Sequence, residues 1–150
     1  MSDIDEKVEE LSRILEEKGD SYVSHAEKVL AEIVDLHDVD CIGSLISCFD
    51  DDSEYDELMF SIIHAIEVFE WEDYVTRVIR SLPQLLQQAP RWAEILHIRI
   101  LNSEACRHAY VEAITGASTD QRESARALLA KLVDAKPKFA EKAKPVLLRL

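Results

Sequence analysis

The sequence predicts an all-α protein, and three observations support this. Only 3 Gly and 4 Pro occur among 150 residues, too few for the many turns of a sheet protein of this length. Apolar residues recur at spacings of three and four, as they do on one face of a helix. Ser, Asp, Gly and Pro separate these runs, where helices begin and end. We therefore expect a single all-helical domain over residues 1–150, with about eight or nine helices.

Four helices are expected in the N-terminal half. Their ranges are 3–18, ended by Gly19; 21–36, capped by Ser21; 39–49; and 54–70. The acidic run over residues 50–53 is expected to be a loop, and Ser53 with Asp56 resembles a capping box for the helix that follows.

Five further helices are expected after residue 71. They cover 72–88, broken or kinked near Pro83; 90–101, opened by Pro90; 103–115, capped by Ser103 and stopped by Gly116; a helix starting at Ser118 or Thr119; and a last helix from Pro137 that Pro145 would interrupt. Antiparallel helix pairs recurring every roughly 35–45 residues predict either a HEAT-like helical repeat or a compact helical bundle.

The charge is negative and unevenly distributed. The chain carries a net charge of -13, and residues 1–57 hold 19 acids against 4 bases. Such a protein repels nucleic acid and anionic lipid and attracts basic partners. No apolar run could span a bilayer, and the N-terminus lacks the apolar segment of a secretory signal. We therefore expect a cytoplasmic protein whose Cys41, Cys48 and Cys106 are reduced.

Catalytic motifs are missing from the sequence. It contains no glycine-rich phosphate loop, nucleophile elbow or Cys-x-x-Cys pair. His64 and Glu67 have the spacing of a metal-ligand pair or a general base with its partner, but no second motif of this kind supplies further ligands. We therefore expect neither an enzyme nor a bound metal or cofactor.

Acidic and aromatic residues gather at both ends of the helix expected over 54–70. Carboxylates can pair with Lys and Arg of a basic partner, and Tyr and Trp supply the desolvated anchors that interfaces favour. For any one acid, the alternative is a solvated surface or a helix cap. The predicted partner-binding residues are Asp50, Asp51, Asp52, Glu54, Tyr55, Asp56, Glu57, His64, Glu67, Glu70, Trp71, Glu72, Asp73 and Tyr74.

From Tyr55 to Tyr110, about a third of the chain, the sequence resembles an all-helical family of immunity proteins from bacterial polymorphic toxin and contact-dependent growth-inhibition systems. The resemblance implies a partner, the toxin domain delivered by a neighbouring cell, which is often a nuclease. The matching residues are Leu58, Met59, His64, Glu67, Leu82, Pro83, Ala89, Pro90, Trp92, Arg99, Asn102 and Ser103.

Charge and resemblance lead to the same function. A nuclease site is basic because it holds phosphates, so an acidic face can occupy the site or its approaches. We expect a cytosolic immunity protein that neutralises a basic toxin domain and contacts neither nucleic acid nor membrane directly. Two alternatives are a helical-repeat scaffold or adaptor that binds other proteins or peptides, and an enzyme whose site is not recognisable.

Overall fold

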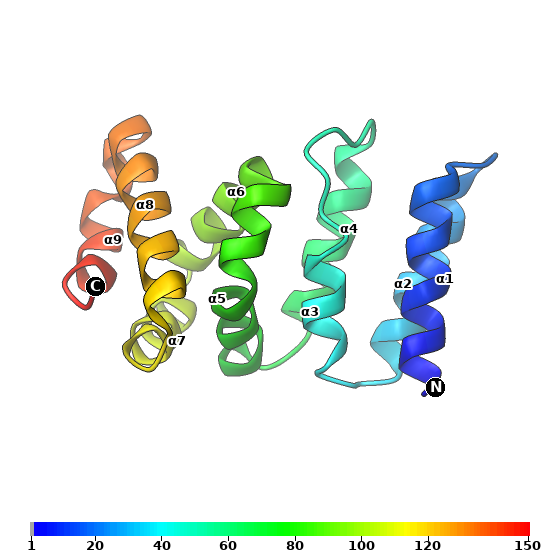
Figure 1. Ribbon diagram of the computed structural model, residues 1–150, viewed down its shortest axis with the longest axis horizontal. Coiled ribbons are helices and arrows are strands. Elements are labelled where there is room, and N and C mark those ends of the chain that lie inside the picture. Colours follow the sequence, from blue (N-terminus) through cyan, green and yellow to red (C-terminus); the bar gives the residue numbers. More distant parts are fainter. Residues whose placement is uncertain (1) are drawn as a thin grey trace. The chain divides into compact units, whose positions relative to one another are not determined.

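The computed structural model describes residues 2–150, and every regular element in that range is a helix (Figure 1), which confirms the all-α prediction. Contacts between helices cluster in two compact units. The first unit ends at Glu70, and the second runs Trp71–Leu150. Whether the chain folds as one domain stays a prediction. No helix in the described range is long and apolar enough to cross a membrane.

The first unit contains four helices, α1 (Asp3–Glu17), α2 (Tyr22–Asp35), α3 (Cys41–Ile46) and α4 (Asp56–Glu67). Helix α1 packs on α2 and α3, and α4 packs on the same two helices. Helix α4 buries six of its twelve residues, so the apolar pattern predicted its burial correctly. The core of the unit is formed by fully buried side chains, among them Leu11, Ile33, Ile42, Phe49 and Ile62.

Helix ends in the first unit differ from the prediction. Lys18, and not Gly19, is the left-handed residue that ends α1, with φ 50°. Helix α3 is shorter than the predicted range 39–49, because its flanks are turns closed by backbone hydrogen bonds. Ser21 precedes α2 in a left-handed conformation, φ 56°, from which its side chain makes no capping hydrogen bond.

The predicted capping box at the start of α4 is wrong. The residue before this helix is Tyr55, which caps nothing through its side chain. Ser53 lies two residues too early, and its Oγ accepts a hydrogen bond from the Tyr55 N–H at 3.4 Å. Asp56 is the first residue of α4, where its carboxylate faces the positive end of the helix dipole.

The second unit contains α5 (Trp71–Gln88), α6 (Pro90–Leu101), α7 (Glu104–Thr115), α8 (Thr119–Ala135), the 3₁₀ turn η1 (Pro137–Phe139) and α9 (Ala140–Leu147). Helix α5 packs against α6, α7 and α8. It is unbroken at Pro83, where the buried Leu82 and Leu85 hold the helix to the core. Helix α9 likewise continues through Pro145, so a helix break is wrong at both prolines. Packing outweighs the backbone hydrogen bond that each proline removes.

Local capping in the second unit agrees with the sequence. Pro90 is at the start of α6, and Ser103 accepts a hydrogen bond from the Cys106 N–H at the start of α7. Gly116 ends α7. Ser118 forms a full capping box with Gln121 at the start of α8. These four signals act over one helical turn, which is why the sequence alone sufficed to place them.

A buried polar pair joins α6 to α7. His97 is 1% exposed, and its Nδ1–H donates to the Ala93 carbonyl at 2.8 Å. Its Nε2 accepts from the Tyr110 hydroxyl, also at 2.8 Å. Burial lowers the pKa of His97 to about 4 and raises that of Tyr110. Both ring nitrogens of a neutral His97 are therefore satisfied, which lets a polar side chain occupy the core.

Candidate partner-binding surface

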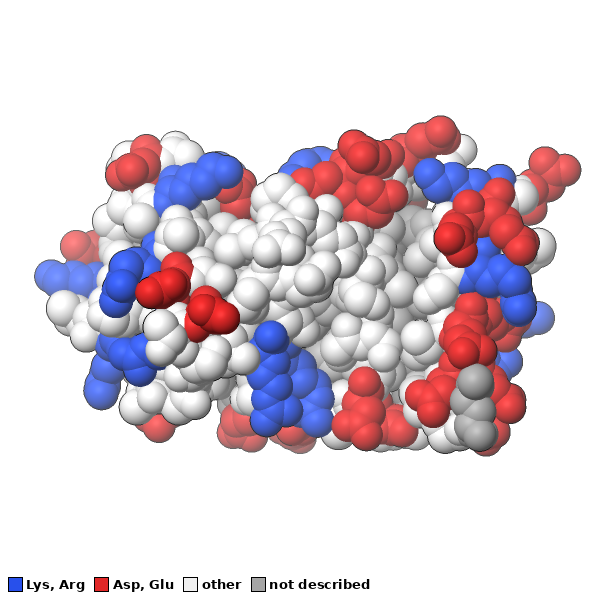
Figure 2. All heavy atoms as spheres, viewed as in Figure 1, with Lys and Arg blue, Asp and Glu red and all other residues white. Residues whose placement is uncertain are grey.

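The two units carry opposite net charge. Residues 1–70 hold 21 acids and 4 bases, a net charge of -17, whereas residues 71–150 hold 9 acids and 13 bases, a net charge of +4. Figure 2 shows Asp and Glu side chains gathered over the loop between α3 and α4 and also over α1. The negative charge thus belongs to the first unit as a whole and is not confined to the ends of α4.

Two hydrogen bonds to Asp50 shape the α3–α4 loop. Its Oδ1 accepts from the Asp52 N–H at 2.9 Å, and its carbonyl accepts from the Ser53 N–H at 3.2 Å. Asp50 and Asp51 are half-buried, and the rest of the predicted cluster in this segment is exposed. The exposed members are Asp52, Glu54, Tyr55, Asp56 and Glu57. The loop therefore uses Asp50 for its own fold and presents the following carboxylates to solvent.

An open pocket of about 480 Å³ lies beside this loop. One wall is the turn between α1 and α2, residues 18–24, and the other is formed by Glu54, Tyr55 and Glu57. The Tyr22 and Tyr55 rings meet edge to face with centroids 5.8 Å apart. Burial, and then the nearby negative charge of Glu54, raise the pKa of Tyr22. We call this the acidic–aromatic pocket.

Two residues of this pocket were missed by the sequence analysis. Asp20 and Tyr22 line it but belong to the α1–α2 turn, far from the acidic loop in the sequence. Only folding of the chain brings the two segments together. A tyrosine beside an acidic turn was the available signal, but helical spacing gave no reason to pair it with Tyr55.

A second groove, of about 440 Å³, runs between α2 and α4. His64 lines it and is exposed, whereas Glu67, one turn further, is half-buried. The Ser61 Oγ lies 3.2 Å from Glu27 Oε1 and 3.0 Å from the Glu57 carbonyl oxygen, so it links the two helices across the groove. His64 and Glu67 lie toward the end of α4, away from the acidic–aromatic pocket at its start.

The other predicted residues lie after α4. Glu70 is exposed and ends the first unit, while Trp71, Glu72, Asp73 and Tyr74 open α5 in the second unit. Trp71 is 46% exposed, and Asp73 pairs with Arg77 at 3.8 Å. Tyr74 is only 2% exposed, on the core face of α5 beside Val75. Its prediction as a surface anchor is wrong, because the helical phase of α5 turns it inward.

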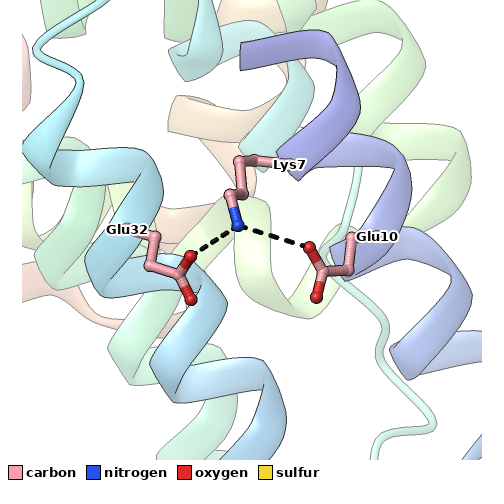
Figure 3. Close-up of polar contacts among 3 residues, drawn as sticks. All are labelled: Lys7, Glu10 and Glu32. Carbon is pink, nitrogen blue, oxygen red and sulfur yellow. Dashed lines mark hydrogen bonds and ion pairs between the residues drawn. The ribbon is translucent and has the colours of Figure 1, made fainter. Parts of the chain in front are cut away.

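Lys7, a basic residue of the first unit, pairs with two carboxylates of the same unit. Figure 3 shows Lys7 of α1 reaching between Glu32 of α2 and Glu10 of its own helix. The Lys7 Nζ bonds Glu32 and lies 3.6 Å from Glu10 Oε2. The bond to Glu32 raises the pKa of Lys7 and lowers that of Glu32. This contact ties α1 to α2.

Residues with metal-binding or nucleophilic side chains are dispersed. Within residues 2–150, no three His, Cys, Asp or Glu side chains are grouped so that they could hold a metal ion. Cys41 is buried, Cys48 and Cys106 are half-buried, and all three are free thiols. Burial raises the pKa of the Cys48 thiol to about 11, so this cysteine is protonated at neutral pH and is a poor nucleophile.

Comparison with known proteins identifies the family of the chain. A family model described as Immunity protein 30 matches residues 9–110. The match covers most of the first unit and continues through α5, α6 and part of α7. It contains the whole segment from Tyr55 to Tyr110 that resembled immunity proteins, so that resemblance is confirmed. No curated protein and no solved structure matches the chain.

Proposed function

Because the chain belongs to the Immunity protein 30 family, we propose that it binds and neutralises a cognate toxin domain through the acidic surface of its first unit. The observation that carries the proposal is the net charge of -17 over residues 1–70, with exposed carboxylates on the α3–α4 loop. We define the acidic surface by residues of this loop, of the first turn of α4 or of the adjoining pocket, namely Asp20, Tyr22, Asp52, Glu54, Tyr55, Asp56 and Glu57.

The partner that suits this surface is a basic toxin domain, and a nuclease is the class we propose. Nucleases hold phosphates with Lys and Arg, so the carboxylates of the loop meet complementary charge there. Opposite charge accelerates the encounter of two proteins, and fast capture is what protects a cell from a toxin. The proposed place of action is the cytoplasm, where such a toxin would meet its nucleic acid.

The acidic–aromatic pocket suits a cationic side chain of the toxin. Three acids, Asp20, Glu54 and Glu57, line the pocket against one base, Lys18. The edge-to-face pair of Tyr22 and Tyr55 lies in its wall. A Lys or Arg entering there would meet negative charge and an aromatic ring together, an arrangement that favours cations over neutral side chains. Tyr55, 38% exposed, is the aromatic anchor of the acidic surface.

A growth assay tests the proposed function. Cells that express the toxin domain encoded beside the gene for this chain are grown with and without the chain. We expect the chain to restore growth and to co-purify with the toxin domain in a stoichiometric complex. Growth arrest in both cultures, with no complex, would contradict the proposal. A scaffold or adaptor role stays a prediction, and no feature of the structure favours it over the immunity role.

The acidic surface is tested separately by association kinetics. The triple variant Asp52→Asn, Glu54→Gln and Glu57→Gln removes three exposed carboxylates from the loop and α4. We expect its association rate with the toxin domain to fall roughly ten-fold at low ionic strength, and its salt dependence to weaken.

The matched control changes the net charge equally in the second unit. The triple variant Glu123→Gln, Asp134→Asn and Glu141→Gln also removes three exposed carboxylates. We expect it to slow association by less than about two-fold, because steering depends on where the charge lies. Equal slowing by both triple variants would show that only net charge matters and that the α3–α4 loop is not the binding surface.

A further inference from the structure

Two helical stripes face each other across the groove between α2 and α4. The α2 stripe comprises Glu27, Leu30, Ala31, Val34 and Asp35, and the α4 stripe comprises Ser61, His64, Ala65 and Val68. Both follow the three-and-four spacing of a single helix face. Leu30 and Ala65 are 4% and 5% exposed and form the floor, whereas Val68 is 58% exposed. The groove therefore presents an apolar strip to solvent between α2 and α4.

The charged residues of the groove are acidic. Its lining includes Glu27 and Asp35 but no Lys or Arg. These two acids are two helical turns apart on α2, roughly 12 Å along the axis. Leu30, Ala31 and Val34 lie between them in the sequence, so an apolar stretch is bounded by a carboxylate on each side. The small side chain of Ala31, which is exposed, leaves room above the floor.

We propose that this groove receives the apolar face of a basic, amphipathic segment of the toxin domain. The inference rests on the proposed function and adds an anchor that the acidic surface lacks. Charge complementarity selects this occupant, since the α2 wall carries Glu27 and Asp35 and the surrounding unit is acidic, while the floor is apolar. A segment with apolar residues on one side and Lys or Arg on the other satisfies both surfaces at once.

The two surfaces then have separate kinetic roles. Exposed carboxylates act over a distance and set the association rate, whereas buried apolar contacts form only in the complex and set the dissociation rate. The groove is lined by His64, one of the residues that the sequence predicted to bind a partner. Its other lining residues are Ser61, apolar residues and residues of α2, so an argument from acidic clusters on α4 did not identify them.

The test uses two groove variants, each with a matched control. Ala31→Trp fills the groove from an exposed position, and Ala130→Trp makes the same change at an exposed position of α8. Val68→Ser removes an exposed apolar contact without changing charge, and Leu148→Ser does so at a residue that is 76% exposed. We expect each groove variant to raise the dissociation rate of the neighbouring toxin domain roughly ten-fold, and each control to change it by less than about two-fold.

The outcomes separate this inference from the proposed function. If both groove variants dissociate at the wild-type rate while the loop triple variant associates slowly, the groove is not an anchor and the proposed function stands. If the wild-type chain does not bind the toxin domain, the proposed function fails. The groove is then tested with a synthetic amphipathic peptide of Leu and Lys, titrated into the isotope-labelled chain.

The peptide experiment has its own controls. We expect amide resonances of Ala31, His64 and Val68 to shift with the Leu/Lys peptide. The shifts should be absent in the Ala31→Trp variant and with a peptide that carries Glu in place of Lys. Shifts elsewhere on the chain only, or equal shifts with the acidic peptide, would overturn the proposed occupant.

Discussion

The two units of this chain differ in how they use their sequence. The first has a net charge of -17, and the residues with positive φ other than glycine that the structure describes, Lys18, Ser21 and His37, all lie in it. Ser2 caps α1, but helices α2, α3 and α4 begin without a side-chain cap. The second unit has a net charge of +4, capped starts at Ser103 and Ser118, and a satisfied polar pair in its core.

This difference indicates that the first unit favours binding of a partner and that the second favours stability of the fold. Crowded carboxylates repel one another and destabilise a compact unit, and left-handed residues other than glycine add backbone strain. A surface that must attract a basic partner retains such features at a cost in stability. Helix caps and satisfied core groups add stability and offer a partner nothing. The four predictions below test this contrast, from the largest expected effect to the smallest.

Each unit has its own core, so the largest effects should be local. Phe49 in the first unit and Trp92 in the second are 1% and 0% exposed. We expect Phe49→Ala and Trp92→Ala each to lower the free energy of unfolding by about 3–5 kcal/mol, through lost burial and a cavity. Hydrogen exchange should show the greater loss of protection in α1–α4 for the first variant and in α5–α8 for the second. Equal loss of protection across both units in either variant would contradict separate cores.

The second unit should be sensitive to acid through His97. Its folded pKa of about 4 lies below the unfolded value of 6.5, so the unfolded chain binds the extra proton first. Stability is therefore retained above pH 6.5 and lost as the pH falls toward 4, by about 3 kcal/mol in total. Urea unfolding at several pH values measures this loss. In His97→Gln the part of the slope due to His97 should vanish, and an unchanged slope would show that carboxylates account for the whole effect.

The alkylation rate of Cys48 reports on the first unit alone. Burial raises the pKa of Cys48 from 9.0 to about 11, which reduces its thiolate fraction near pH 8 roughly a hundred-fold. We expect alkylation of Cys48 by iodoacetamide to be slower by about this factor in the folded chain than in urea, followed site by site with mass spectrometry. A folded rate equal to the rate in urea would show that the turn after α3, which contains Cys48, opens readily and that the first unit is looser than its packing indicates.

The smallest effects concern two serines that precede helices. Ser118 caps α8, so Ser118→Ala should lower the free energy of unfolding by about 1 kcal/mol. Ser21 has φ 56° and caps nothing, so Ser21→Gly should raise that free energy by roughly 0.5–1 kcal/mol through relief of strain. Thermal and urea unfolding measure both. A lower free energy of unfolding in Ser118→Ala and a higher one in Ser21→Gly would support the contrast between the units. A lower free energy of unfolding in both variants would contradict it.

Predictions from the sequence succeeded where the signal was local. Pro90, Ser103 and Gly116 mark helix ends because each acts on the backbone within one turn. The sequence failed at Pro83 and Pro145, where helices continue because neighbouring side chains are held in the core. It also failed at Ser53, where a loop geometry specific to this fold redirects the hydroxyl.

The candidate site divides in the same way. The sequence identified the exposed carboxylates of residues 52–57 because an acidic run between two apolar helices has to face water. It placed Tyr74 wrongly because the phase of α5 is fixed by what that helix packs against. It missed Tyr22 and Asp20 because pocket walls come from segments distant in the sequence.

The amino-acid sequence by itself determined that the protein is helical, that its N-terminal half is strongly acidic, and that it resembles an immunity protein. These properties follow from spacing, composition and motif, which need no knowledge of distant contacts. Tertiary structure decided which carboxylates share a pocket with an aromatic pair, and that α2 and α4 leave an apolar groove whose α2 wall carries two acids. Those features depend on which helix faces are buried against each other, a choice made by packing of the whole unit.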